Sequence, residues 1–179
     1  MLFFPKPVSA LLLMAAMASL GACGLFQHQP TPPVTPVVAK PAYDQVAAIR
    51  AAGVREQSVI SVNPLVDPGV SGLQTAAKAD ENAGRYAAAA AKLDQAMQLS
   101  PQSPDLLQDR AEMAVRLKDY PTAERLAHES WSLGPKLGPL CARNWQTIVE
   151  MRLQANDAVA AASARKWLQQ CHKPGQQRY

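Results

Sequence analysis

Aromatic residues are scarce in this chain of 179 residues: Phe, Trp and Tyr together make up 6%, although 48% of the residues are hydrophobic. Alanine supplies much of the hydrophobic content. Strands favour aromatic and β-branched side chains, so this composition argues against a β-sandwich or β-barrel and favours closely packed helices. A strong excess of charge is also missing. The formal net charge of +4 is too small to indicate nucleic-acid binding by itself.

Recognisable catalytic motifs are missing as well. The chain has no Gly-x-Ser-x-Gly nucleophile elbow, no Walker A sequence and no glycine-rich phosphate loop. Its three histidines, His28, His128 and His172, are far apart in the sequence, and His128-Glu129 lacks the second histidine of a zinc-protease motif. We therefore expect no enzyme and no metal site. The alternative is an enzyme with an unrecognised site, for which His128 and Glu129 are the candidate pair.

No hydrophobic run is long enough to cross a bilayer as a permanent helix, which needs about 20 apolar residues. The longest candidate, Val8 to Leu20, follows the single cation Lys6 and carries no charge. A short uncharged run of this kind, placed after a basic residue at the N-terminus, is typical of the central region of a secretory signal peptide. The sequence therefore predicts an exported protein.

A cysteine follows the predicted signal directly, in the tetrapeptide Leu20-Gly21-Ala22-Cys23. This resembles the lipobox of bacterial lipoproteins. The resemblance implies that residues 1–22 are cleaved off and that Cys23 carries a diacylglyceryl thioether and an N-acyl chain, with no other cofactor. Two or three acyl chains anchor firmly where one is marginal. The alternative is an ordinary secretory signal that happens to end near a cysteine.

The residue after the cysteine is Gly24. In enterobacterial lipoproteins an Asp at this position favours the inner membrane, so the resemblance implies the outer membrane, with the protein on its periplasmic face. The inner membrane is the less favoured alternative.

The segment 23–42 is expected to be a lipidated N-terminus followed by a proline-rich linker. Five prolines lie close together: Pro30, Pro32, Pro33, Pro36 and Pro41. Such sequences favour polyproline II over helix, at about 3.1 Å per residue. The linker is therefore expected to reach roughly 60 Å from the bilayer. A proline-rich ligand for a partner is the alternative.

Residues 67–171 contain an internal repeat. At a shift of 34 residues Tyr86 aligns with Tyr120, Ala89 with Ala123 and Pro101 with Pro135. Each copy predicts two helices, and Asp67-Pro68 and Ser103-Pro104 are N-cap and first-turn signals for the first helix of a copy. The pattern resembles the tetratricopeptide repeat, a helix–turn–helix unit of 34 residues. Arg110 and Ser130 depart from it. The alternative is a generic alanine-rich helical bundle.

A third copy is expected from Pro139 to Cys171, where Trp167 takes a position that the pattern gives to a small residue. We expect it to cover the exposed end of the stack. The fold class is therefore all-α, a short α-solenoid of about three repeats. The segment 43–66 is expected to form a helix over Tyr43–Ala52, ended by Gly53, and an extended strap. It would pack on the first repeat as a cap. Residues 172–179 form the C-terminal tail.

The resemblance also implies a binding surface. Tetratricopeptide repeats bind partners on the concave surface lined by the first helix of each repeat. The pattern places on it Gln74, Lys78, Glu81, Gln108, Glu112, Arg116, Trp145, Val149 and Arg152. Mixed charge with one large aromatic suits an extended peptide. The alternative is ordinary exposed surface, or, for Trp145, a place in the core.

Two cysteines remain besides Cys23. Cys141 and Cys171 each lie 15 residues from Asn156, the centre of the predicted last turn. In an antiparallel helix pair such positions are side by side, and an exported protein meets an oxidising compartment. We expect a disulfide. A metal site with His172 is the alternative, but no fourth ligand is evident.

These features predict a lipid-anchored adaptor of the bacterial envelope that faces the periplasm. Its expected partner is another envelope protein or peptide, and no nucleic-acid partner is expected. A scaffold for outer-membrane protein insertion or peptidoglycan synthesis is one form of this hypothesis. A pilotin-like carrier for a secretin subunit is the alternative.

Overall fold

A computed structural model describes residues 43–56 and 67–173, and all of them lie in one structural unit, Pro41–Tyr179. Within these ranges the chain forms seven α-helices and no strand. The predicted signal peptide, lipobox and linker, the strap at 57–66 and most of the tail lie outside the described residues. The helices are α1 (Gln45–Arg55), α2 (Pro68–Asn82), α3 (Tyr86–Leu99), α4 (Pro104–Arg116), α5 (Tyr120–Leu133), α6 (Pro139–Gln154) and α7 (Ala158–Gln170).

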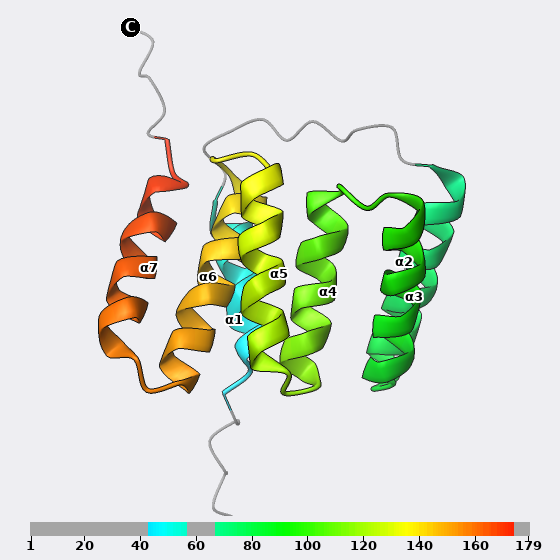
Figure 1. The fold of residues 1–179 in the computed structure, drawn as a ribbon, viewed down its shortest axis with the longest axis horizontal. Helices are drawn as coiled ribbons and strands as arrows, with labels where there is room; N and C mark the ends of the chain where they lie inside the picture. Colours follow the sequence, from blue (N-terminus) through cyan, green and yellow to red (C-terminus); the bar gives the residue numbers. More distant parts are fainter. Residues whose placement is uncertain (1–42, 57–66, 174–179) are drawn as a thin grey trace, which may run out of the picture. The chain divides into compact units, whose positions relative to one another are not determined.

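The six helices from α2 to α7 form three antiparallel pairs, α2–α3, α4–α5 and α6–α7, which follow one another in chain order (Figure 1). Each pair contacts the next, through α3 with α4 and through α5 with α6. This arrangement confirms the predicted all-α solenoid of three helix–turn–helix units.

The turns inside the three pairs share one backbone feature. Gly84, Lys118 and Asn156 all adopt positive φ, at 73°, 61° and 59°. A residue in this left-handed region is a common way to end a helix, because it lets backbone N–H groups satisfy the last carbonyls. Asp119 and Asp157 then cap the second helix, each accepting a hydrogen bond from a backbone N–H three residues on. The repeat is therefore visible in backbone conformation where the side chains differ.

Small side chains allow the paired helices to approach closely. Ala89, Ala123 and Ala161, near the start of the second helix of each pair, are completely buried. The departure at Ser130 has a local reason. Its hydroxyl lies 2.7 Å from the carbonyl oxygen of Pro104 and 2.9 Å from Oδ1 of Asn144, so a serine links all three of α4, α5 and α6.

The N-terminal helix α1 differs from its prediction in two ways. It continues through Gly53 to Arg55, and it packs on α6 and α4 instead of capping the first repeat. Its apolar stripe explains the choice. Val46 and Ile49 are buried in a cluster with Val115 of α4 and Met151 of α6. The helix thus lies against the second and third pairs, behind α5 and α6 in the view of Figure 1.

Gly53 is the point of closest approach between α1 and α6. A Cβ atom there would lie 2.8 Å from Cγ of Arg143 and 3.1 Å from the carbonyl oxygen of Pro139. We expect Gly53→Ala to lower the free energy of unfolding by about 1–2 kcal/mol, because overpacking forces α1 outward. Urea unfolding followed by circular dichroism measures the change. Gly72→Ala, in an exposed part of α2 with no atom within 4 Å of the new Cβ, should instead stabilise by about 0.5–1 kcal/mol. Equal effects of the two substitutions would contradict this account of Gly53.

Candidate binding surfaces

The first helices of the three pairs, α2, α4 and α6, face α1, which covers part of the surface that they line. Polar contacts to α4 and α6 fix the N-terminal end of α1. Arg116 Nη1 lies 2.9 Å from the Asp44 carboxylate, and the Tyr43 hydroxyl donates to Glu150 Oε1 at 2.6 Å. Burial, followed by the hydrogen bond to Glu150, raises the pKa of Tyr43 to about 12. The concave surface is therefore partly filled by the chain's own helix.

A charge network centred on Glu112 lies beneath α1. The side chain of Glu112 has 0% exposure. It accepts from Arg50 Nε of α1 at 2.7 Å and from Arg143 Nη2 of α6 at 2.7 Å. Arg50 also pairs with Glu81 of α2 at 2.8 Å, and Arg143 with Asp109 of α4 at 2.6 Å. The buried carboxylate of Glu112 thus binds two arginines. Each arginine also binds a second acid, which is Glu81 of α2 for Arg50 and Asp109 of α4 for Arg143.

The pKa shifts in this network follow from its geometry. Burial by itself lowers the pKa of Arg143, but the attraction of Glu112 and Asp109 outweighs burial and raises it. For Glu81, burial raises the pKa, and hydrogen bonds from Arg50 and Lys78 lower it by more. Both shifts favour the charged form, so Arg143 and Glu81 stay ionised near neutral pH.

A cavity of about 680 Å³ remains open between α1 and α2, above α4. Arg50 and Gly53 of α1 line one side, and Gln74 and Lys78 of α2 line the other. The nearly buried side chains Ala77, Leu93 and Met113 form an apolar floor. The cavity therefore combines a small apolar area with a charged rim of both signs.

The predicted concave residues fall into two groups. Gln74, Lys78 and Glu81 line the cavity. Gln108 and Glu112 are completely buried, and Arg116 is bound to Asp44. Gln108, Glu112 and Arg116 therefore hold the domain together and are not available to a partner. Sequence patterns did not show this, because they gave no sign that α1 would lie over the second and third repeats.

The prediction for the third repeat is wrong in register. Trp145 and Val149 are buried, and Arg152 pairs with Glu124 of α5 at 2.5 Å. The α6 residues that contact α1 or the α4 network are instead Arg143, Thr147, Glu150 and Gln154. Helix α6 begins 35 residues after α4 but has 16 residues where α4 has 13, so the extra length lies within α6, and an alignment that places it before α6 assigns the wrong face. The disulfide is the sequence signal that could have given the correct register of α6. Because Cys141 is bonded to Cys171, the side of α6 that bears Cys141 must face α7.

The disulfide between Cys141 and Cys171 is present, with the Cα atoms 5.6 Å apart. It joins the start of α6 to the end of α7, as predicted from their equal distance to the turn. Both sulfurs are bonded to each other, so they are not available as metal ligands. His172 instead lies with Nδ1 3.1 Å from Glu56 Oε2. Among the described residues, no group of three or more His, Cys, Asp or Glu side chains is placed to bind a metal.

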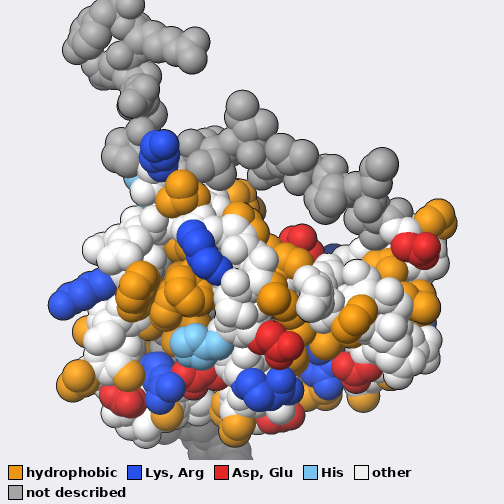
Figure 2. All heavy atoms as spheres, turned by 45° about the horizontal axis from the view of Figure 1, so that its top comes forward, with side chains coloured by type: hydrophobic (Ala, Val, Ile, Leu, Met, Phe, Trp, Pro, Cys, Tyr) orange, Lys and Arg blue, Asp and Glu red, His pale blue; other side chains and the backbone are white. Residues whose placement is uncertain are grey.

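The chain's three tryptophans meet on α5, α6 and α7, and we call Trp131, Trp145 and Trp167 the tryptophan face. Trp145 stacks on Trp167, with ring centroids 5.4 Å apart and planes 11° apart, and Trp131 meets both edge-on. Trp145 is 7% exposed and Trp167 45% exposed. Figure 2 shows hydrophobic side chains gathered beside a histidine, with Lys and Arg side chains around them. Trp167 thus packs against α5 and α6, and part of its ring stays exposed.

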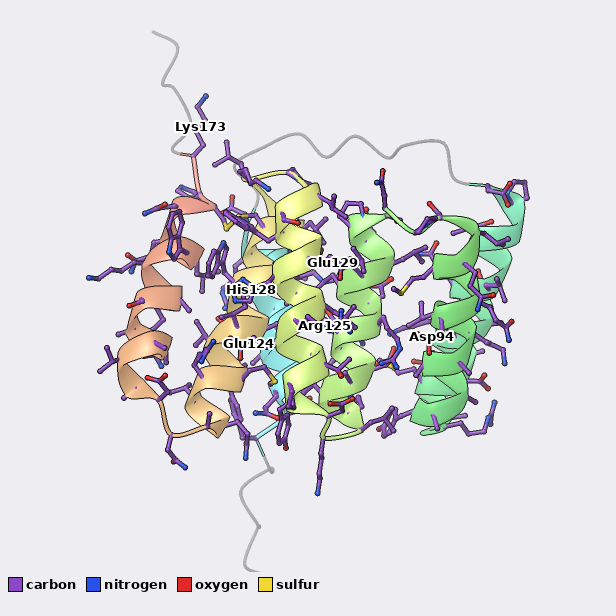
Figure 3. The ribbon with its side chains drawn as sticks, viewed as in Figure 1. Asp94, Glu124, Arg125, His128, Glu129 and Lys173 are labelled. Carbon is purple, nitrogen blue, oxygen red and sulfur yellow. A yellow bond between two sulfur atoms is a disulfide. The ribbon has the colours of Figure 1, made fainter. Side chains whose placement is uncertain are left out.

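The candidate catalytic pair His128 and Glu129 does not converge. Both residues lie on α5 (Figure 3), where neighbouring positions point in different directions. His128 contacts the ring of Trp145 and approaches Glu124, while Glu129 pairs with Arg125. The two side chains therefore serve separate surface contacts in this structure.

The comparison with known families bears on the central part of the chain, where residues 82–136 match the tetratricopeptide repeat family. The fold is a tetratricopeptide-repeat solenoid. Among solved structures, the chain is similar to the globular C-terminal domain of P. aeruginosa LpoP, at 28% sequence identity and a TM-score of 0.56. The match covers 59% of this chain and 99% of that domain. No curated protein matches significantly. No helix among the described residues is long and apolar enough to cross a membrane.

Proposed function

We propose that the protein is a lipid-anchored adaptor of the bacterial envelope, which binds a segment of a partner protein in the cavity between α1 and α2. The observation that carries the proposal is the partly filled concave surface. The chain's own helix covers α6 and part of α4, whereas the side of α2 that bears Gln74 and Lys78 stays open. Repeats of this type bind protein segments, and the likeness to the LpoP domain supports a role in the envelope.

The chemistry of the cavity limits what it accepts. An apolar floor of Ala77, Leu93 and Met113 suits one apolar side chain of a partner. The rim offers Lys78, with its side chain 55% exposed, and the amide of Gln74, which approaches Asp109 only at 3.5 Å. A partner segment therefore gains hydrogen bonds at the rim and burial at the floor, without displacing α1.

A photo-crosslinking amino acid placed at position 78 tests the cavity in cells. We expect it to capture one envelope protein as a discrete product, because Lys78 projects over the cavity. The same amino acid at Lys118, an exposed residue in the α4–α5 turn, serves as the control and should capture none of it. A second arm uses Lys78→Glu with the crosslinker at position 74, which should reduce capture at least tenfold. Equal capture from positions 78 and 118 would count against the cavity.

The lipid anchor on Cys23 and the outer-membrane location are parts of the same proposal. Replacing the thiol removes the nucleophile that accepts diacylglycerol, so we expect Cys23→Ala to abolish incorporation of radiolabelled palmitate. We also expect the precursor to stay uncleaved. Cys141→Ala/Cys171→Ala is the matched control and should keep the label. Undiminished labelling of the Cys23→Ala chain would refute the anchor.

A further inference from the structure

The tryptophan face differs from the rest of the described surface in both chemistry and charge. All three tryptophans of the chain lie in it. The exposed part of this face is therefore apolar and is formed largely by indole rings, which combine an apolar body with one N–H donor.

The charged groups around the tryptophan face leave it positive. The acids on α5 are already bound, Glu124 by Arg152 at 2.5 Å and Glu129 by Arg125 at 3.3 Å. Lys136 places its Nζ 4.4 Å from the ring centroid of Trp131, and Lys166, one position before Trp167 on α7, is exposed. The face therefore has one lysine in contact with an indole and a second lysine on the neighbouring side of α7, while the α5 acids are paired with other cations.

The packing of the tryptophan face makes it rigid before any contact forms. Trp145 and Trp167 are stacked, and Trp131 meets both edge-on. The Cys141–Cys171 disulfide joins α6 to α7 at one end of the cluster. Lys136 also donates to backbone carbonyls at the end of α5, among them Ser132 at 2.8 Å. Binding at this face requires little ordering of side chains, which favours contact with a broad surface.

We propose that the tryptophan face docks the domain onto an anionic lipid bilayer. Indole rings prefer the boundary between headgroups and acyl chains, and lysines near them are attracted to anionic headgroups. The chain outside the structure provides the second argument. Residues 24–42 separate Cys23 from the domain by at most roughly 60 Å, so the anchor of the proposed function keeps this face close to a bilayer. This inference rests on the proposed anchor for bringing the domain near a bilayer, but its test uses a protein without the anchor.

The test uses the mature chain from residue 23 with Cys23→Ser, which carries no lipid, so failure of the docking proposal stays separate from failure of the anchor. The probes are vesicles of phosphatidylethanolamine and phosphatidylglycerol (3:1) and vesicles of phosphatidylcholine alone. Tryptophan emission reports on this face alone, because all three tryptophans lie in it. We expect a blue shift and quenching by brominated acyl chains with the anionic vesicles, and little change with phosphatidylcholine.

Variants separate docking from a general attraction of charge. Lys166→Gln should weaken binding to the anionic vesicles by roughly fivefold, as for the loss of one basic residue near such a surface. Lys118→Gln removes the same charge at the α4–α5 turn and should change binding less than about twofold. Trp167→Phe keeps an aromatic ring and should bind, whereas Trp167→Ser should lose most of the affinity. Because Lys166 is exposed, the Lys166→Gln variant should fold normally. It therefore still tests docking if the Trp167→Ser variant fails to fold.

Three results would overturn the proposal. One is unchanged emission with the anionic vesicles. Another is equal loss of binding in the Lys166→Gln and Lys118→Gln variants, which would mean that net charge alone drives association. The third is an emission shift with an acidic peptide, such as hexaglutamate flanked by leucines, but no shift with vesicles. That result would assign the tryptophan face to a protein partner.

Discussion

Glu112→Gln is expected to lower the free energy of unfolding by about 3–5 kcal/mol, the range for breaking a buried ion pair by removing one partner. Glu112 has no exposed side-chain area and accepts from Arg50, Arg143 and Gln108. The amide keeps the size of the side chain but loses the charge that balances two arginines. Arg143 then retains only Asp109, and Arg50 only Glu81. The loss is large because desolvated cations remain without their main counter-charge.

Urea unfolding followed by circular dichroism measures this effect, and a matched control is available on α5. Glu129→Gln removes a carboxylate of the same kind from an exposed pair with Arg125. Such surface pairs contribute about 0–0.5 kcal/mol. The double variant Glu112→Leu/Arg143→Met should recover part of the loss, because it removes both charges together. A Glu112→Gln domain as stable as the Glu129→Gln domain would show that the network contributes nothing to stability.

Loss of the Cys141–Cys171 disulfide is expected to cost about 3.5 kcal/mol by the chain-entropy model for a closed loop of this length. The cysteines are 30 positions apart and both are buried. The loss should concentrate in the third pair, since the bridge joins the start of α6 to the end of α7. We expect hydrogen exchange in α7 to increase more than in α2 or α3, because α7 ends the array and packs mainly on α6, with one ring contact to α5.

The disulfide prediction has its own control. Cys141→Ala/Cys171→Ala should lower stability to the level of the chemically reduced wild type, and dithiothreitol should have no further effect on the variant. If the oxidised wild type, the reduced wild type and the variant all unfold at the same urea concentration, the bridge does not stabilise the domain.

Local signals predicted the repeat domain well. Asp67-Pro68 and Ser103-Pro104 fixed two helix starts, since an N-cap oxygen followed by proline suits the first turn in any context. The spacing of Tyr86 and Tyr120 fixed the repeat length. Cys141 and Cys171 were paired because equal distance from a turn is a statement about helix geometry, which does not depend on other elements.

Tertiary context decided the features that the sequence did not predict. Gly53 suggested a helix end, since glycine is frequent there, but at this position it allows contact with Arg143. Glu112 looked like a solvated carboxylate because nothing near it in sequence indicates that Arg50, 62 residues away, covers it. Trp145 was placed on the concave surface by a repeat alignment that did not allow for the greater length of α6, 16 residues against 13 in α4. In each case the missing information was the position of a distant helix.

The packing of α1 against the second and third pairs determines how the domain carries mechanical load. The chain enters at Tyr43, and α1 is fixed to α6 and α4 by Val46, Ile49 and Arg50. A pull on the residues before Tyr43 is therefore resisted first by the interface of α1 with the second and third pairs. The first pair, α2–α3, contacts the rest through α3 and α4 and through the Arg50–Glu81 ion pair. It lies outside the main path of the force, so tension in the tether reaches the helix that bears Gln74 and Lys78 chiefly through that ion pair.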